Sequence, residues 1–367
     1  HSELLIVPQK PDNQYGTDLL FPKMSNIRNR IDFIKGFLLL SIILEHNDFI
    51  AVQCPSLKVV FESYDVFGFY IISFLFPGKP FSIDFIINRA VRYLVPFIIF
   101  FSIASILYSI YSDAMLLPSI INYFQGILIA STEKIKMSTG FKLYWFLPSF
   151  FTLTLLRSLY LYNKHLKFII ILISLSFHLY LANYFSSYAH WMPWGVSVSL
   201  FCFPVCLLME FFSKSIFSNN KILLICFLIF ITSLYLIFAS QSKLYFYRMI
   251  FPTMLTPQFL ILHDLCALCC IPGMALLSYY WTPRIICQIG RYSLGMYLIH
   301  QLVYKCLLQI NNLKFEIIAA FVNITLTVMI SLILITIINK IPLLKSKIFP
   351  KNLKELLSWP RCISFTN

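Results

Sequence analysis

The sequence predicts an all-α, polytopic integral membrane protein with about ten transmembrane helices and both termini in the cytosol. Hydrophobic residues make up 59% of the 367 and charged residues only 12%, whereas soluble proteins are about half apolar and a quarter charged. The mean hydropathy of +0.79 agrees. Apolar runs of about 20 residues, the length that crosses a bilayer, recur along the chain. The net charge of +14 does not indicate nucleic acid, because the basic residues lie in short clusters between those runs.

Ten apolar runs bounded by charges or turn residues are predicted to span the membrane. In chain order they cover residues 32–50, 59–76, 90–111, 143–161, 168–186, 194–212, 221–239, 258–281, 287–309 and 315–339. An even number of crossings puts both termini on one side. On or beside the tails and alternate loops of that side lie 20 of the 29 Lys and Arg. Because positive residues concentrate on the cytosolic side of a membrane, both tails are predicted to be cytosolic.

Three parts are predicted along the chain. A polar cytosolic tail covers residues 1–31, the ten-helix membrane domain covers 32–340, and a basic cytosolic tail covers 341–367. The stretch from Lys340 to Lys354 is predicted to face anionic lipid. Eight of the ten cysteines lie in or beside apolar runs, so we expect small buried hydrophobic side chains there, with neither disulfides nor a metal site.

Predicted span one carries an unusual number of ionisable residues: Asp32, Lys35, Glu45, His46 and Asp48. Such groups are costly inside a membrane and indicate function by default. Lys35 and His46 are eleven residues apart, so on a helix they lie within about 20° of one face and ~16 Å apart along the axis. One face therefore carries a cation near the cytosol and an imidazole, the side chain best suited to proton transfer near neutral pH, deep inside.

A structural alternative exists for the same residues. Asp32 and Lys35 also have the i, i+3 spacing of an ion pair at a helix end, and His46 could be a hydrogen-bonded histidine of the bundle interior. On an ideal helix, Glu45 and Asp48 point about 100° and 200° away from His46, so neither is an obvious partner for its ring.

The segment Arg89-Ala-Val-Arg92 enters predicted span three from the cytosolic side. Two Arg at i, i+3 share a helix face and offer several planar donors to phosphate oxygens. Anchoring by the positive-inside rule is the alternative explanation.

Two further motifs complete a pattern: Trp145-Phe146-Leu147 opens predicted span four, and Gly290-Arg-Tyr-Ser-Leu-Gly-Met-Tyr-Leu-Ile-His300 lies in span nine. Together with the Lys35 to His46 spacing and the Arg pair, they resemble acyltransferase family 3, the transmembrane acyltransferases that modify cell-surface glycans. The chain looks most like the branch of sugar O-acetyltransferases that includes fucose acetylases.

The resemblance implies an O-acyltransferase of the inner (plasma) membrane. It would move an acyl group, expected to be acetyl, from cytosolic acyl-CoA to a hydroxyl of a cell-surface or lipid-linked glycan such as O-antigen, capsule or exopolysaccharide. Acetyl-CoA would be the donor substrate, with no tightly bound cofactor. The implied partners are the acyl-CoA, the glycan, the bilayer and glycan-assembly machinery, with no nucleic acid.

The resemblance also implies roles for individual residues. His46 would act as general base or as nucleophile, with Lys35 and Asp32 in the catalytic set, and Arg89 and Arg92 would hold the CoA phosphates. A further set would line the acceptor site or, equally, serve as core and interface residues: Glu45, Trp145, Tyr297 and His300.

Three alternatives to this function remain at the level of the sequence. A transporter or flippase for lipid-linked sugars also carries buried charges, although such folds have paired broken helices in two corresponding halves, and no such symmetry is visible. A membrane acyltransferase of another family would lack the Lys-to-His spacing and the Arg pair. A structural partner in a glycan-assembly complex would tolerate substitution of His46.

Overall fold

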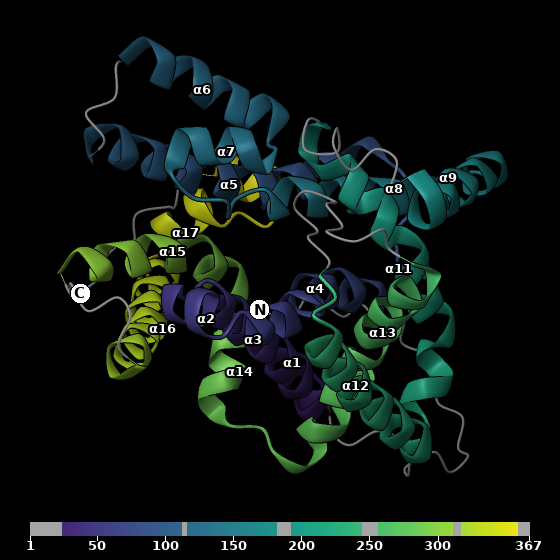
Figure 1. Cartoon of the computed structure of the whole chain (residues 1–367). Helices are drawn as coiled ribbons and strands as arrows, with labels where there is room; N and C mark the ends of the chain where they lie inside the picture. Colours follow the sequence, from purple (N-terminus) through teal and green to yellow (C-terminus); the bar gives the residue numbers. More distant parts are fainter. Residues whose placement is uncertain (1–23, 112–115, 182–191, 244–255, 311–316, 359–367) are drawn as a thin grey trace, which may run out of the picture.

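The computed structural model describes residues 24–111, 116–181, 192–243, 256–310 and 317–358. Within these residues every regular element is a helix (Figure 1). Five of the helices are long and apolar enough to cross a membrane: α5 (Ile83–Tyr111), α11 (Val196–Phe217, preceded by the short turn Pro193–Gly195), α12 (Asn220–Ser240), α13 (Pro257–Tyr280) and α16 (Ile317–Lys340). They coincide with predicted spans three, six, seven, eight and ten, which confirms the all-α, polytopic class.

The other five predicted spans fall on shorter or interrupted helices. They are α1 (Met24–Glu45) with α2 (Asp48–Gln53), α3 (Pro55–Glu62) with α4 (Asp65–Phe74), α8 (Phe146–Tyr162), α9 (Lys164–Ser176) with the π-helical turn η1 (Phe177–Leu181), and α14 (Arg284–Arg291) with α15 (Ser293–Ile310). The end of predicted span five, from residue 182, lies outside the described residues. The count of ten crossings and the cytosolic placement of both tails stay predictions.

A continuous helix through predicted span one is wrong, and Asn47 explains why. Asn47 has extended backbone angles, and its side chain accepts hydrogen bonds from the backbone N–H groups of Phe49 and Ile50 at 3.0 and 3.3 Å. It therefore caps a new helix, α2, instead of continuing α1. The break falls directly after His46.

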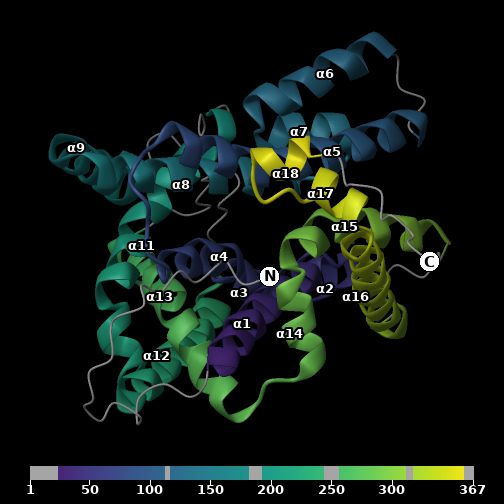
Figure 2. The ribbon, with the colours of Figure 1, turned by 180° about the vertical axis from the view of Figure 1, so that it is seen from behind.

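Helix α1 occupies the middle of the molecule, with α15 and α16 on one side and α12 and α13 on the other (Figures 1 and 2). Its closest partner is α14. A Cβ atom added at Gly290 would lie 1.6 Å from the carbonyl oxygen of Asp32, and one at Gly36 would lie 2.1 Å from that of Ile286. Small residues let helix backbones touch in a membrane, so these two glycines fix α14 against the middle of α1.

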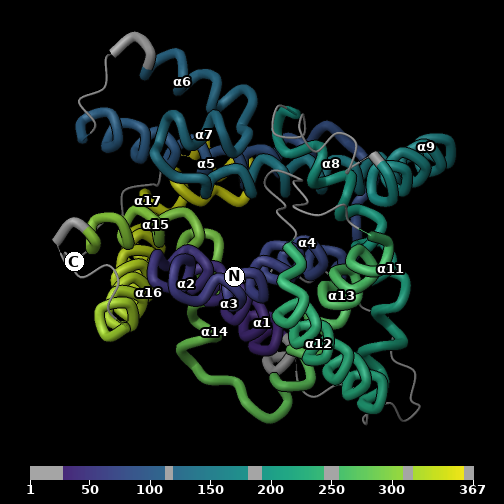
Figure 3. Tube along the Cα trace, in the orientation of Figure 1, coloured from purple at the N-terminus to yellow at the C-terminus, as the bar shows by residue number. Residues whose placement is uncertain are grey.

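Some helices lie outside every predicted span. α6 (Leu116–Ile129) and α7 (Thr132–Thr139) pack together and against α5, and α17 (Pro342–Ile348) and α18 (Leu353–Leu357) also contact α5 (Figure 2). The backbone N–H of Leu353 donates to the Asn88 side chain at 3.1 Å, beside Arg89. The described part of the C-terminal tail therefore packs on the helix that carries the Arg pair. Figure 3 shows the path of the Cα trace through these helices.

Candidate active site

His46 lies where α1 stops. Its backbone N–H still bonds to the carbonyl of Ile42 at 3.2 Å, but the next residue, Asn47, has left the helix. The ring atom Nδ1 lies 3.6 Å from Oε1 of Glu45, and 24% of the His46 side chain is exposed. The prediction that Glu45 points away from the ring is wrong, because ideal-helix angles do not apply beyond the last helical residue. An imidazole with a carboxylate at one nitrogen and an accessible edge can exchange a proton through the other nitrogen.

A second imidazole, that of His300 on α15, lies parallel to the first. The two ring centroids are 5.9 Å apart with 8° between their planes. Nδ1 of His300 is 2.8 Å from the carbonyl oxygen of Tyr297 and 3.1 Å from that of Met296. Because a carbonyl only accepts, Nδ1 carries the hydrogen and Nε2 of the neutral ring is an acceptor. This Nε2 atom is buried and has no hydrogen-bond partner within the described residues, so it is an unused acceptor in the ring that lies parallel to His46.

An unbroken series of rings joins the predicted acceptor-site residues to His46. Trp145 and Phe146 have centroids 6.4 Å apart, Phe146 and Tyr297 5.2 Å, and Tyr297 and His300 6.0 Å. The Tyr297 hydroxyl donates to the carbonyl of Leu143, just before α8. The structure thus brings Trp145, Tyr297 and His300 from α8 and α15 into one cluster with His46.

Cations gather about three turns before His46, near the middle of α1. This part of the helix is called its cation-rich end. Lys35 is close enough to Asp32, Arg28 and Arg92 for their charges to act on it. The carboxylate of Asp32 also pairs with the guanidinium of Arg291 at 3.5 Å. Arg92 and Lys35, from α5 and α1, therefore lie near one another. The close ion pair of Asp32 is with Arg291 on α14, and not with Lys35 as the i, i+3 spacing suggested.

Arg89 lies one turn before Arg92 on α5. Its guanidinium stands over the ring of Phe85, with 5.0 Å to the centroid, and its side chain is half-buried. By helix geometry both guanidinium groups are on one face of α5. Asp32 is fourteen residues before His46, about 20 Å by helix rise, so it belongs to the cation-rich end of α1 and not to the imidazole end.

Sequence reasoning missed three charged residues of the site region. Arg291 stands inside the quoted motif of span nine, and Glu62 and Asp65 flank the break between α3 and α4. The latter two are buried, with 8% and 1% of their surface exposed. The signal that singled out span one, ionisable residues in a predicted span, was present here too.

Arg157 on α8 is buried for a structural reason. It donates to the carbonyls of Ser73 and Phe76 at 3.0 and 2.7 Å and pairs with Glu210 on α11 at 2.8 Å. The last carbonyls of a helix have no partner within it, so Arg157 caps the end of α4. It takes no part in the candidate site.

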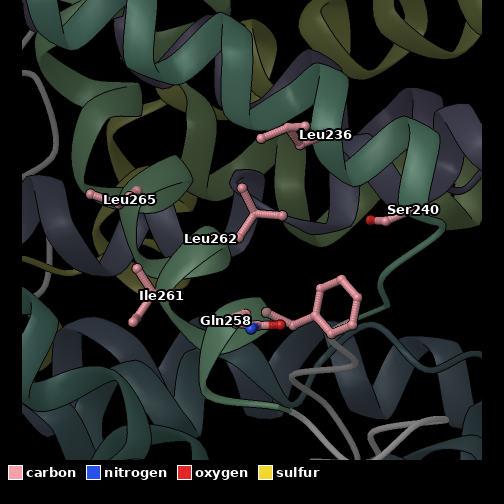
Figure 4. Close-up of a pocket in the computed structure, with 7 residues that line it drawn as sticks. Leu236, Ser240, Gln258, Ile261, Leu262 and Leu265 are labelled. Carbon is pink, nitrogen blue, oxygen red and sulfur yellow. The ribbon is translucent and has the colours of Figure 1, made fainter.

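A groove between α12 and α13 is lined by Leu236, Ser240, Gln258, Phe259, Ile261, Leu262 and Leu265 (Figure 4). Only two of these seven residues are polar, and none belongs to the candidate site. The groove offers no cation to a phosphorylated donor.

The described cysteines agree with their predicted role. Seven of them are buried and free: Cys202, Cys206, Cys226, Cys266, Cys269, Cys270 and Cys287. Cys306, predicted to be buried, is exposed on α15. Within the described ranges, no three His, Cys, Asp or Glu side chains are arranged to hold a metal ion.

The match to a known protein family covers the residues of the candidate site. The family model for the acyltransferase domain matches residues 28–340, from α1 to the end of α16. This range includes Lys35 on α1 and His46 after it, the Arg pair of α5 and the ring cluster of α8 and α15. No curated protein and no solved structure gives a significant match to the chain. The chain belongs to acyltransferase family 3, and it is a membrane acyltransferase.

Proposed function

We propose that this acyltransferase moves an acetyl group from cytosolic acetyl-CoA to a hydroxyl of a cell-surface or lipid-linked glycan at the inner membrane. The observation that supports this proposal is that charged groups and imidazole rings lie at two separate places along α1. Lys35, Asp32 and Arg92 gather at one end, and His46 with His300 at the other. Helix rise separates Lys35 from His46 by ~16 Å.

The donor's own chemistry accounts for this arrangement. The phosphates of CoA are too highly charged for the hydrocarbon core, so they stay at the cytosolic mouth, where Arg89 and Arg92 supply multi-donor contacts. The uncharged pantetheine arm then carries the thioester along α1 toward His46. The cations hold the donor, and the imidazole end performs the transfer.

In the transfer step, Nε2 of His46 takes the proton of the acceptor hydroxyl while the hydroxyl oxygen attacks the thioester carbon. The tetrahedral oxyanion collapses, the carbon–sulfur bond breaks, and the proton on Nε2 goes to the departing thiolate. The products are the glycan ester and free CoA. The route through an acyl-imidazole, with His46 as nucleophile, uses the same residue and stays open.

His300 and the ring cluster are assigned to the acceptor. The unpartnered Nε2 of His300 can accept a hydrogen bond from a sugar hydroxyl. Trp145 and Tyr297 supply ring surface beside it. Glu45, next to His46, orients the ring that takes the proton.

The test is the mass of the glycan made by cells that carry His46→Ala. We expect loss of the acetyl increment, at least about 100-fold, because proton transfer contributes on the order of 10²–10⁴ to such a rate. His165→Ala is the matched control, since His165 is exposed on α9 and has no contact with the site. Normal acetylation by inserted His46→Ala protein contradicts the proposal, and loss of glycan export with normal acetylation would indicate a transporter.

A further inference from the structure

Polar side chains from α2 and α15 lie next to His46, at the end of α1 that is remote from Lys35 (Figure 1). Asp48 begins α2, and its backbone N–H donates to the hydroxyl of Tyr304 on α15 at 2.9 Å. Oδ2 of Asp48 lies 3.8 Å from Nζ of Lys305. Lys305 is also close enough to His46 for its charge to act on the ring. Two contacts therefore hold Asp48 against α15 beside the imidazole.

The same part of α15 has hydrogen-bonding atoms that the protein does not use. His300 and Tyr304 are spaced i, i+4 and share one face of the helix, and Gln301 and Lys305 share the neighbouring face. Nε2 of His300 and Oε1 of Gln301 are buried acceptors without a partner among the described residues. The Tyr304 hydroxyl accepts from Asp48, so its own hydrogen is free to donate. Such unused atoms are costly away from water, and a bound molecule with several hydroxyl groups would satisfy them.

Some atoms of this region are accessible and others are buried. The side chains of Asp48 and Lys305 are 37% and 48% exposed, and that of His46 is 24% exposed. Tyr304, by contrast, is only 7% exposed. A ligand that touches both the exposed ion pair and the buried atoms would therefore lie against His46.

The charges decide which class of ligand fits. The ammonium of Lys305 and the carboxylate of Asp48 cancel, and the carboxylate would repel a phosphate group. At the cation-rich end, in contrast, several cations surround Asp32. A sugar hydroxyl is both a donor and an acceptor, so adjacent hydroxyls of one ring match a carboxylate beside an ammonium, each through a charge-assisted hydrogen bond. The pair fits a neutral sugar better than a second phosphate.

We propose that Asp48, Gln301, Tyr304 and Lys305 form a subsite that binds the hydroxyl groups of a neutral sugar ring of the acceptor and presents one hydroxyl to Nε2 of His46. The inference rests on the proposed function and adds these four residues to the acceptor site. The donor arrives along α1 from the cation-rich end, and the acceptor arrives from the opposite side. The subsite residues bind the sugar and exchange no proton with the reacting atoms.

Two near-isosteric variants test the subsite. Tyr304→Phe removes one neutral hydrogen bond, so we expect the rate to fall up to about tenfold. Lys305→Met removes a charge-assisted donor, so we expect a fall of about tenfold or more. The assay is release of CoA thiol from acetyl-CoA by inverted membrane vesicles of the native cells, which contain the endogenous acceptor, normalised to inserted protein.

A second measurement separates sugar binding from a structural contact between α2 and α15. Bromoacetyl-CoA is a donor analogue that alkylates a nucleophile near its thioester, and its reaction with His46 needs no acceptor. In both variants we expect alkylation of His46 at the wild-type rate. Tyr123→Phe, whose hydroxyl bonds to Ser102 between α6 and α5 at 2.8 Å, is the matched control for the lost tyrosine hydroxyl. Lys214→Met, at an exposed lysine of α11, is the control for the lost charge.

The outcomes are distinct. Slower transfer with unchanged alkylation in both variants supports the subsite. Normal transfer in either variant overturns it, and so does a parallel loss of transfer and alkylation, because the residues would then only hold His46 in place. If Tyr304→Phe protein is not recovered in membranes, Lys305→Met decides alone. Full activity of His46→Ala in the same vesicles would contradict the proposed function itself, whatever the two subsite variants do.

Discussion

The two ends of α1 differ in how their chemistry is held. At the cation-rich end, Lys35 and Arg92 lie on different helices and Arg291 is 44% exposed, so water or a substrate completes their contacts. At the imidazole end, His300 is 1% exposed, its ring lies beside those of His46 and Tyr297, and its Nδ1 bonds to a backbone carbonyl. Cations that keep some exposed surface can bind a charged ligand when it arrives, whereas a buried base needs its orientation fixed in advance. The difference teaches that binding of the donor and transfer of the acyl group depend on separable parts of the chain.

The largest effect is expected for a substitution at the backbone contact between α1 and α14. In Gly290→Ala the new Cβ would overlap the Asp32 carbonyl at 1.6 Å and approach the Gly36 nitrogen at 2.7 Å, both backbone atoms that must move. We expect destabilisation on the order of 3 kcal/mol and a clearly lower Tm for the detergent-solubilised protein. Gly273→Ala on α13 is the control, because its nearest atom is 3.3 Å away. Equal Tm values for the two variants would show that α1 and α14 are not in backbone contact.

Removing the Arg pair is expected to affect one end alone. Arg89→Ala with Arg92→Ala should raise KM for acetyl-CoA about tenfold or more, because each hydrogen bond to a charged group contributes about 1.5–3 kcal/mol. The rate at saturating donor should change little. Lys164→Ala, an exposed cation at the start of α9, is the control. A fall in the rate at saturating acetyl-CoA with unchanged KM would show that the Arg pair acts in the transfer step. Donor binding and acyl transfer would then not depend on separate parts of the chain.

A smaller effect is expected at His300. His300→Gln removes the unpartnered Nε2 acceptor, and we expect about a tenfold lower rate with unchanged KM for acetyl-CoA, the value of one hydrogen bond to a neutral acceptor. His263→Gln is the matched control, because His263 on α13 is also fully buried with one unpartnered ring nitrogen but lies outside the candidate site. If both variants lose activity equally, His300 is a packing residue.

Composition and charge were enough to predict the membrane class, five uninterrupted spans and, at the cation-rich end, Asp32, Lys35 and the Arg pair. The two helix breaks were not predicted, although polar stretches mark both of them, residues 45–48 and 62–65, because each stretch was counted as part of one continuous span. The break at Asn47 leaves Glu45 beside His46, a contact that ideal-helix angles did not predict. Arg291 was missed for another reason, since only the close approach at Gly290 places it on Asp32.

The most direct test of the account is the path of the thioester from the Arg pair to His46. Bromoacetyl-CoA carries an alkylating carbon in place of the acetyl methyl, and labelled peptides identify the side chain it reaches. In inverted vesicles we predict alkylation of His46, competed by CoA and weakened in the Arg89→Ala and Arg92→Ala variant, with none in right-side-out vesicles because CoA does not cross the bilayer. Alkylation that spares His46, or that proceeds equally from the outer side, would contradict the account.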